Sequence, residues 1–114
     1  MNLSAYRGTR VLVTGHTGFK GSWLCEWLLA LGAKVHGFAL EPPTRPSLFN
    51  QLKLANRISS HTIGDVRDLQ AVLRTMRRVK PDFVFHLAAQ PLVRRSYDRA
   101  LDSFQYRPRI QRVG

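Results

Sequence analysis

The fold of this chain can be predicted from one glycine-rich segment, Thr14-Gly15-His16-Thr17-Gly18-Phe19-Lys20-Gly21. Its glycines recur at every third position, directly after the apolar run Val11–Val13 and directly before a segment with helical periodicity. In a strand–turn–helix unit, Gly15 permits a sharp exit from the strand and Gly18 lets the backbone approach a ligand, while Gly21 lets the helix pack closely on the sheet. The stretch therefore predicts the first strand, turn and helix of a parallel α/β sheet.

Apolar periodicity on the C-terminal side of this turn predicts alternating helices and strands. The short apolar runs bounded by turn residues indicate strands at residues 10–14, 35–40, 61–64 and 83–87. Apolar residues at three- and four-residue intervals indicate helices at 19–31, where Phe19, Trp23 and Trp27 form one stripe, and at 68–79, with a short helix within 47–54 and another starting near Asp98. This order predicts the α/β class, as the N-terminal part of a Rossmann-type doubly wound parallel sheet.

The glycine turn also indicates a ligand. Phosphates sit well over the unpaired N–H groups at a helix N-terminus, and the strand and helix around this turn favour dinucleotide binding over a merely connecting turn. The end of the second strand leaves NAD and NADP both open. Ala39 and Leu40 cannot bind a ribose; Glu41 could accept from its hydroxyls, and Arg45 could attract a 2′-phosphate.

Composition limits the other functions. The 18 Lys and Arg residues against 7 Asp and Glu give a net charge of +11, but the cations are spread along the chain and are not interleaved with aromatic residues. We therefore expect solvated faces, together with a phosphate-binding surface as an option, and no nucleic-acid partner. No apolar run could cross a bilayer and no secretory signal begins the chain, so we expect a cytoplasmic protein without a membrane partner. The single Cys25 and the residue spacing indicate no metal site.

Three segments in this order resemble the extended short-chain dehydrogenase/reductase family, over roughly residues 8–104. They are the turn Thr14–Gly21, the Gly-Asp-Val-Arg-Asp segment 64–68 and the Phe-His-Leu-Ala-Ala-Gln segment 85–90. Within that family, residues 18–24, 46–49 and 89–97 resemble the CDP-glucose 4,6-dehydratases.

The resemblance implies a tightly held NAD that takes hydride from C4 of the sugar of CDP-glucose. Water is then lost across C5 and C6, and the hydride returns at C6; full-length relatives are expected to be homo-oligomers. Asp65 would accept from the adenine amine, and residues 87–90 would run beneath the inner ribose and nicotinamide. The cofactor-binding residues implied are Gly15, Thr17, Gly18, Phe19, Lys20, Gly21, Asp65, Val66, Leu87, Ala88, Ala89 and Gln90.

The end of the chain departs from the family pattern. After Gln105 the family continues with a Thr-Asn pair and a long apolar helix, whereas this chain reads Tyr-Arg-Pro-Arg-Ile-Gln-Arg-Val-Gly, and Pro108 opposes a helix. None of the three tyrosines has a lysine four residues later, so the family's catalytic pair is absent and we expect no catalytic residue.

We therefore expect an incomplete NAD(P)-binding Rossmann domain at residues 1–105 and an atypical basic, disordered tail at 106–114. The fourth strand would then have an unpaired edge. The function expected is that of a truncated, inactive CDP-glucose 4,6-dehydratase-like protein. The alternatives are a fragment of another nucleotide-sugar epimerase or dehydratase, a non-catalytic nucleotide-binding module, or, more remotely, a basic nucleic-acid-binding protein.

Overall fold

A parallel β-sheet forms the centre of the molecule. The computed structural model describes residues 3–41, 47–87 and 109–112. The strands are β1 (Arg10–Thr14), β2 (Lys34–Ala39), β3 (Ser60–Ile63), β4 (Phe83–His86) and β5 (Arg109–Arg112). They lie in the order β3-β2-β1-β4-β5, and every neighbouring pair is parallel. The expected α/β class and doubly wound parallel sheet are thus confirmed.

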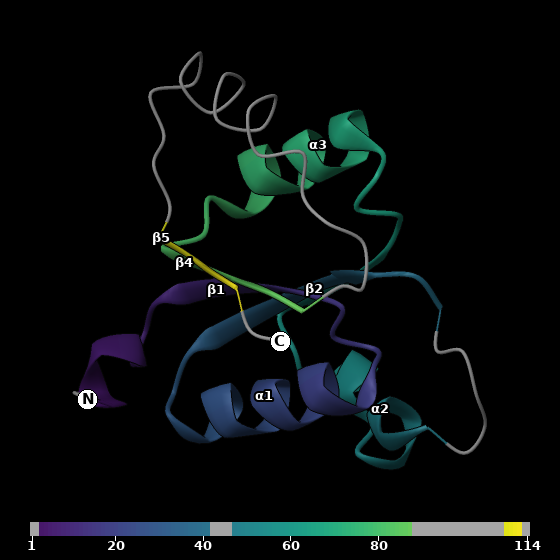
Figure 1. Ribbon diagram of the computed structural model, residues 1–114. Helices are drawn as coiled ribbons and strands as arrows, with labels where there is room; N and C mark the ends of the chain where they lie inside the picture. Colours follow the sequence, from purple (N-terminus) through teal and green to yellow (C-terminus); the bar gives the residue numbers. More distant parts are fainter. Residues whose placement is uncertain (1–2, 42–46, 88–108, 113–114) are drawn as a thin grey trace.

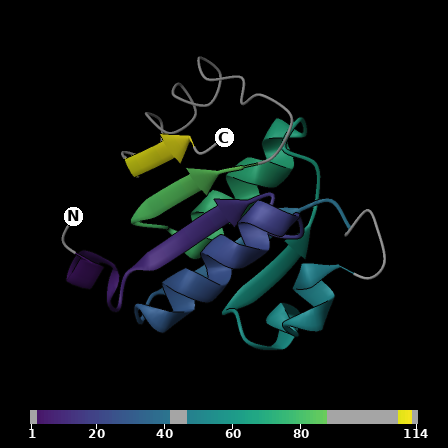
Figure 2. The same cartoon turned by 60° about the horizontal axis from the view of Figure 1, so that its bottom comes forward.

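Helices cover both faces of the sheet. Figure 1 shows α3 (Leu69–Val79) on one face, with α1 (Phe19–Ala30) and the short α2 (Leu48–Gln51) on the other. The turned view in Figure 2 shows α1 running along the sheet beside β1. Two short 3₁₀ turns complete the described elements, η1 (Leu3–Tyr6) and η2 (Leu54–Asn56).

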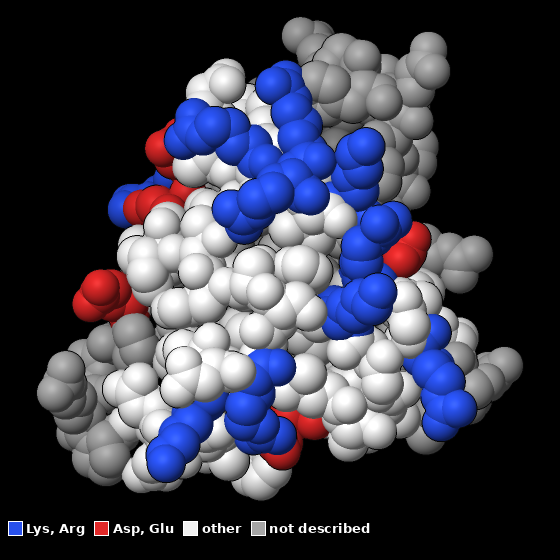
Figure 3. Space-filling view, turned by 180° about the vertical axis from the view of Figure 1, so that it is seen from behind, with Lys and Arg blue, Asp and Glu red and all other residues white. Residues whose placement is uncertain are grey.

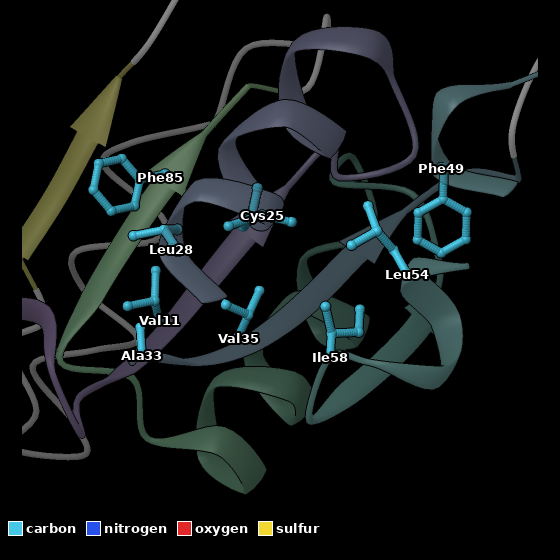
Figure 4. Close-up of a cluster of buried hydrophobic side chains, with 10 residues drawn as sticks. Val11, Cys25, Leu28, Ala33, Val35, Phe49, Leu54, Ile58 and Phe85 are labelled. Carbon is cyan, nitrogen blue, oxygen red and sulfur yellow. The ribbon is translucent and has the colours of Figure 1, made fainter. Parts of the chain in front are cut away.

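The larger core cluster lies between the sheet and α1 (Figure 4). Alternate side chains of β1 and β2 point into it, because successive residues of a strand face opposite sides of the sheet. The buried members of the cluster are Val11, Val13, Cys25, Leu28, Ala33, Val35, Phe49, Leu54, Ile58 and Phe85.

A second cluster lies on the α3 side of the same strands. Leu12, Phe38 and Val84 pack there against Val72 and Met76 of α3. Strands buried on both faces need apolar residues at consecutive positions, which is why the run Val11–Val13 predicted a parallel strand.

Helix α1 buries a face other than its aromatic stripe. Phe19, Trp23 and Trp27 are 69%, 53% and 46% exposed, whereas Gly21, Ser22, Cys25 and Leu28 are buried. The reason is the close approach of the first turn of α1 to the glycine turn, which leaves room for Gly21 and Ser22 but not for an indole ring. Sequence periodicity alone does not separate the two faces, since α1 is apolar nearly all round.

The end of the chain also differs from expectation. Residues 109–112 form β5, which pairs in parallel with β4 in the register Phe83↔Arg109 to His86↔Arg112. The prediction of a disordered tail is therefore wrong for these four residues, and so is that of an unpaired β4 edge. Strand pairing uses backbone groups and places few demands on side chains, so the side-chain pattern of residues 109–112 did not predict β5. Residues 106–108 and 113–114 lie outside the described residues.

Candidate cofactor-binding site

The glycine turn lies where the order of the sheet reverses. From β1 the chain passes to β2 and β3 on one side, and then returns to β4 on the other side of β1. Ligands of open parallel sheets bind at this reversal, beyond the carboxyl ends of the strands. The Leu87 N–H donates to the Thr14 carbonyl over 2.9 Å, which holds the ends of β4 and β1 together beside the turn.

Two backbone hydrogen bonds fix the start of the turn. The Gly15 N–H donates to the Phe38 carbonyl over 3.0 Å, and the Gly18 N–H donates to the Gly15 carbonyl over 3.1 Å. Gly15 has φ +83°, in the left-handed region that side-chain-bearing residues rarely adopt. The sharp exit from β1 predicted for Gly15 is therefore present.

Gly18 and Gly21 lack side chains for different reasons. A Cβ on Gly21 would lie 2.1 Å from the Gly15 carbonyl oxygen and 2.8 Å from the Cα of His16, so Gly21 allows α1 to reach the turn. Among the described residues, a Cβ on Gly18 would meet only the Gly15 oxygen, at an ordinary 3.5 Å. The backbone of Gly18 therefore faces open space, as an approach surface for a ligand requires.

The first turn of α1 presents free backbone donors to that space. Gly18 is the N-cap, with extended backbone (φ −76°, ψ 170°), and no side chain caps the helix. The N–H groups of Phe19, Lys20 and Gly21 point toward the N-terminal end, where the helix dipole favours an anion. The first turn carries no acidic residue, and Lys20 is exposed there. This arrangement fits a pyrophosphate group.

Thr17 braces the turn against β2. Its hydroxyl donates to the Leu40 carbonyl over 2.8 Å, and the residue is 6% exposed. Leu40 and Glu41 follow β2 on the surface, where a bound adenosine ribose would be expected. Arg45, the residue that could attract a 2′-phosphate, lies outside the described residues.

His16 is a site residue that sequence reasoning missed. It is fully buried beneath the turn, and its Nε2 lies 2.6 Å from Nδ1 of His61. Burial, together with the nearby His61, lowers the pKa of His16 to about 3, so the ring is neutral. A glycine within β2, Gly37, is the one sequence feature related to this contact. A Cβ at Gly37 would lie 2.2 Å from the His16 ring. His16 thus fixes the turn to β2 and β3 from below.

Asp65 and Val66 follow β3 at the same edge of the sheet. The Asp65 carboxylate accepts from the Arg67 guanidinium at 2.6 to 3.1 Å and from the Arg67 backbone N–H at 2.9 Å. These hydrogen bonds lower the pKa of Asp65, so it is ionised. Val66 is half-buried against the α3-side cluster. An adenine amine would have to share the Asp65 oxygens with Arg67.

The remaining predicted contacts follow β4. Leu87 is half-buried, and Ala88, Ala89 and Gln90 lie outside the described residues. Next to Leu87, the Thr14 hydroxyl lies 2.6 Å from Nδ1 of the buried His86. The structure therefore brings together the turn, Asp65, Val66 and Leu87 at one edge of the sheet, without describing the other three.

Other chemistry finds no support in the part of the chain that the structure describes. No group of three or more His, Cys, Asp or Glu side chains there could hold a metal ion. Cys25 is buried, and burial raises its pKa to about 12, so its thiol stays protonated. No helix among the described residues has the length and hydropathy needed to cross a bilayer.

Comparisons with known proteins agree with this geometry. The family model of GDP-mannose 4,6-dehydratase matches residues 12–107. CDP-glucose 4,6-dehydratase of Salmonella typhimurium is 52% identical over 99 residues, which cover 87% of this chain and 27% of that protein.

Solved structures share the fold. UDP-glucose 4-epimerase of Brucella ovis, in complex with NAD, is 26% identical with a TM-score of 0.59, over 87% of this chain and 27% of that one. UDP-glucose 4-epimerase of Thermotoga maritima, with UDP-glucose, is 29% identical with a TM-score of 0.59, over 76% and 26%. The chain spans about a quarter of the length of the curated relatives it matches.

Proposed function

This chain belongs to the GDP-mannose 4,6-dehydratase family, within the extended short-chain dehydrogenases/reductases, and from that membership we propose that its glycine turn binds NAD. The observation that carries the proposal is the uncapped first turn of α1 beside Gly18, whose missing side chain leaves open space in front of the free N–H groups. A solved neighbour with the same fold holds NAD, which supports the choice of cofactor.

The placement of the described residues supports the following contacts. Gly15, Gly18, Phe19, Lys20 and Gly21 hold the pyrophosphate, through backbone donors and the Lys20 ammonium. Thr17 acts mainly by bracing the turn, because its hydroxyl already donates to Leu40. Asp65 and Val66 flank the adenine. Leu87 lies along the inner ribose and nicotinamide. For Ala88, Ala89 and Gln90, which are outside the described residues, the family resemblance alone supports the same contact.

We further propose CDP-glucose as the sugar nucleotide of the corresponding complete enzyme. The 52% identity to a CDP-glucose 4,6-dehydratase supports this, as do the segments 18–24 and 89–97 that resemble that enzyme. NAD, when bound, would supply a hydride acceptor for the sugar. The residues of this chain bind and orient the cofactor, and we assign none of them a catalytic role.

The second candidate is part of a nucleotide-sugar epimerase. The solved neighbours include UDP-glucose 4-epimerases at 26% and 29% identity, and a glycine turn serves both reactions. Identity favours the dehydratase. A cytoplasmic location and a homo-oligomeric full-length enzyme are further parts of the proposal, and the sequence analysis alone supports them.

Calorimetric titration of NAD into the 114-residue chain tests the cofactor proposal. We expect saturable binding that Gly18→Val abolishes, because the valine side chain would occupy the pyrophosphate position. Ala30→Val, at the exposed far end of α1, is the matched control and should bind NAD like the parent chain. Equal affinity of the Gly18→Val variant and the parent would contradict the placement. Circular dichroism of both variants excludes unfolding as the cause.

A further inference from the structure

A second polar surface lies on the α3 side of the sheet and runs from the start of β1 toward the β3 edge. In the register Arg10↔Lys34 and His36↔Ser60, the side chains of Arg10, Lys34, His36, Ser60 and Thr62 share the face of Leu12 and Phe38. Leu12 and Phe38 belong to the cluster packed under α3. The same face thus changes from apolar beneath α3 to polar toward the β3 edge and the strand starts.

Two hydrogen bonds organise the polar side chains of this surface. Nδ1 of His36 lies 2.7 Å from the Ser60 hydroxyl, and Nη2 of Arg78, near the end of α3, donates to the Thr62 hydroxyl over 2.8 Å. His36, Ser60 and Thr62 are half-buried, while Arg10, Lys34 and Arg78 are exposed. The imidazole and one guanidinium are therefore held over β3, not free in solvent.

The surface carries excess positive charge. Burial lowers the pKa of His36, and the charges of Arg78 and Arg10 lower it further, so both guanidinium groups act on this ring. The described ion pairs, Arg57–Glu26 and Arg67–Asp65, lie elsewhere. The nearby acid is Asp82, whose carboxylate accepts from the Arg10 backbone N–H over 2.9 Å. Figure 3 views the molecule from behind relative to Figure 1 and shows Lys and Arg gathered over its upper part.

We propose that Arg10, His36, Ser60, Thr62 and Arg78 form a binding site for a tetrahedral oxyanion of the phosphate class. Guanidinium groups and hydroxyls are the donors that bind such anions, and the positive field has no full counter-charge among these residues. Arg10 begins β1, whereas the glycine turn follows the end of β1. Ser60 and Thr62 flank His61, whose side chain lies on the other face of the sheet and contacts His16 beneath the turn. The proposed site and the His16–His61 contact are therefore on opposite faces of the sheet.

The test is an NMR titration of the His36 ring in the full 114-residue chain, with inorganic phosphate against sodium chloride of equal ionic strength. Phosphate should raise the pKa of His36 in a saturable way, because a bound anion stabilises the imidazolium. Arg78→Gln should weaken phosphate binding about tenfold or more, since it removes a charge-assisted donor. Arg74→Gln, one turn earlier on α3 and exposed, is the matched control and should leave binding unchanged.

Two results would overturn the proposal. One is an equal shift of the His36 pKa in chloride and phosphate, which would show charge screening without binding. The other is an equal effect of Arg78→Gln and Arg74→Gln, which would show a diffuse field. If Arg78→Gln loses the native NMR spectrum, Arg10→Gln on β1 tests the same site. An added arm with methyl phosphate separates free phosphate from a phosphate monoester as the ligand that fits best.

Discussion

At the scale of single residues, Gly18 and Gly21 show how one turn combines a structural with a ligand-binding glycine. Gly21→Ala would place a Cβ 2.1 Å from the Gly15 oxygen, so the backbone of the turn or of α1 must move. We expect a loss of about 3 kcal/mol in the free energy of unfolding, toward the upper end for overpacked sites. Urea denaturation measures it.

Gly18→Ala is the control for that prediction. Its Cβ has room, and Gly18 has φ −76°, which alanine adopts readily. We expect a change within about 1 kcal/mol, the usual scale for a residue at an N-cap. Equal losses for the two variants would show that Gly21 does not make the close contact described.

His16 predicts acid sensitivity. The unfolded chain protonates this ring near pH 6.5, whereas in the folded chain its pKa is lowered to about 3. The unfolded state therefore binds more protons between these values, and stability falls as the pH falls through this window. The contribution of His16 to the pH dependence of the free energy of unfolding approaches about 1.4 kcal/mol per pH unit.

The pH dependence of urea midpoints between pH 7 and 5 measures this slope. His61 and His36, whose pKa values are also lowered, add to it in the same direction. His16→Leu should lower the number of protons taken up on unfolding by nearly one, and it places an apolar side chain beneath the turn. An unchanged slope in this variant would mean that His16 is not the buried neutral ring described.

Among the helices and strands, α1 carries both buried and exposed apolar side chains. Leu28 is 1% exposed in the core, whereas Trp23 is 53% exposed. Leu28→Ala should therefore lower the free energy of unfolding by about 3 kcal/mol, as expected for a buried leucine. Trp23→Gln should change it by only about 0.5 kcal/mol. The reverse order in denaturation experiments would indicate that the aromatic stripe of α1 faces the core.

The same helix shows how far the sequence could predict the structure. Apolar runs and turn residues predicted β1 to β4, α1 and α3, because short buried strands and an amphipathic helix leave strong patterns. The buried face of α1 was not predictable, since its choice depends on how closely Gly21 approaches the Gly15 carbonyl. The glycine turn of the site was predictable from spacing. The His16–His61 contact was not, because it joins residues that only the completed sheet brings together.

At the scale of the whole molecule, β5 covers the edge of β4. A chain ending at residue 108 would leave the backbone groups of β4 without this partner, and open apolar edges favour pairing between molecules. We expect this truncated chain to form larger assemblies than the parent, as measured by size-exclusion chromatography with light scattering. Deletion of residues 1–2 is the control and should not change the mass. An unchanged monomeric mass after loss of β5 would contradict this role.

We propose above all that the free N–H groups at the start of α1 bind the pyrophosphate of NAD. An amide NMR titration of the chain with NAD tests it most directly. We expect saturable shifts that are largest for Gly18, Phe19, Lys20 and Gly21, while the amides of α3 from Arg74 to Val79 stay nearly unchanged. Saturable shifts that leave residues 18–21 unmoved, or the absence of any saturable shift, would contradict it.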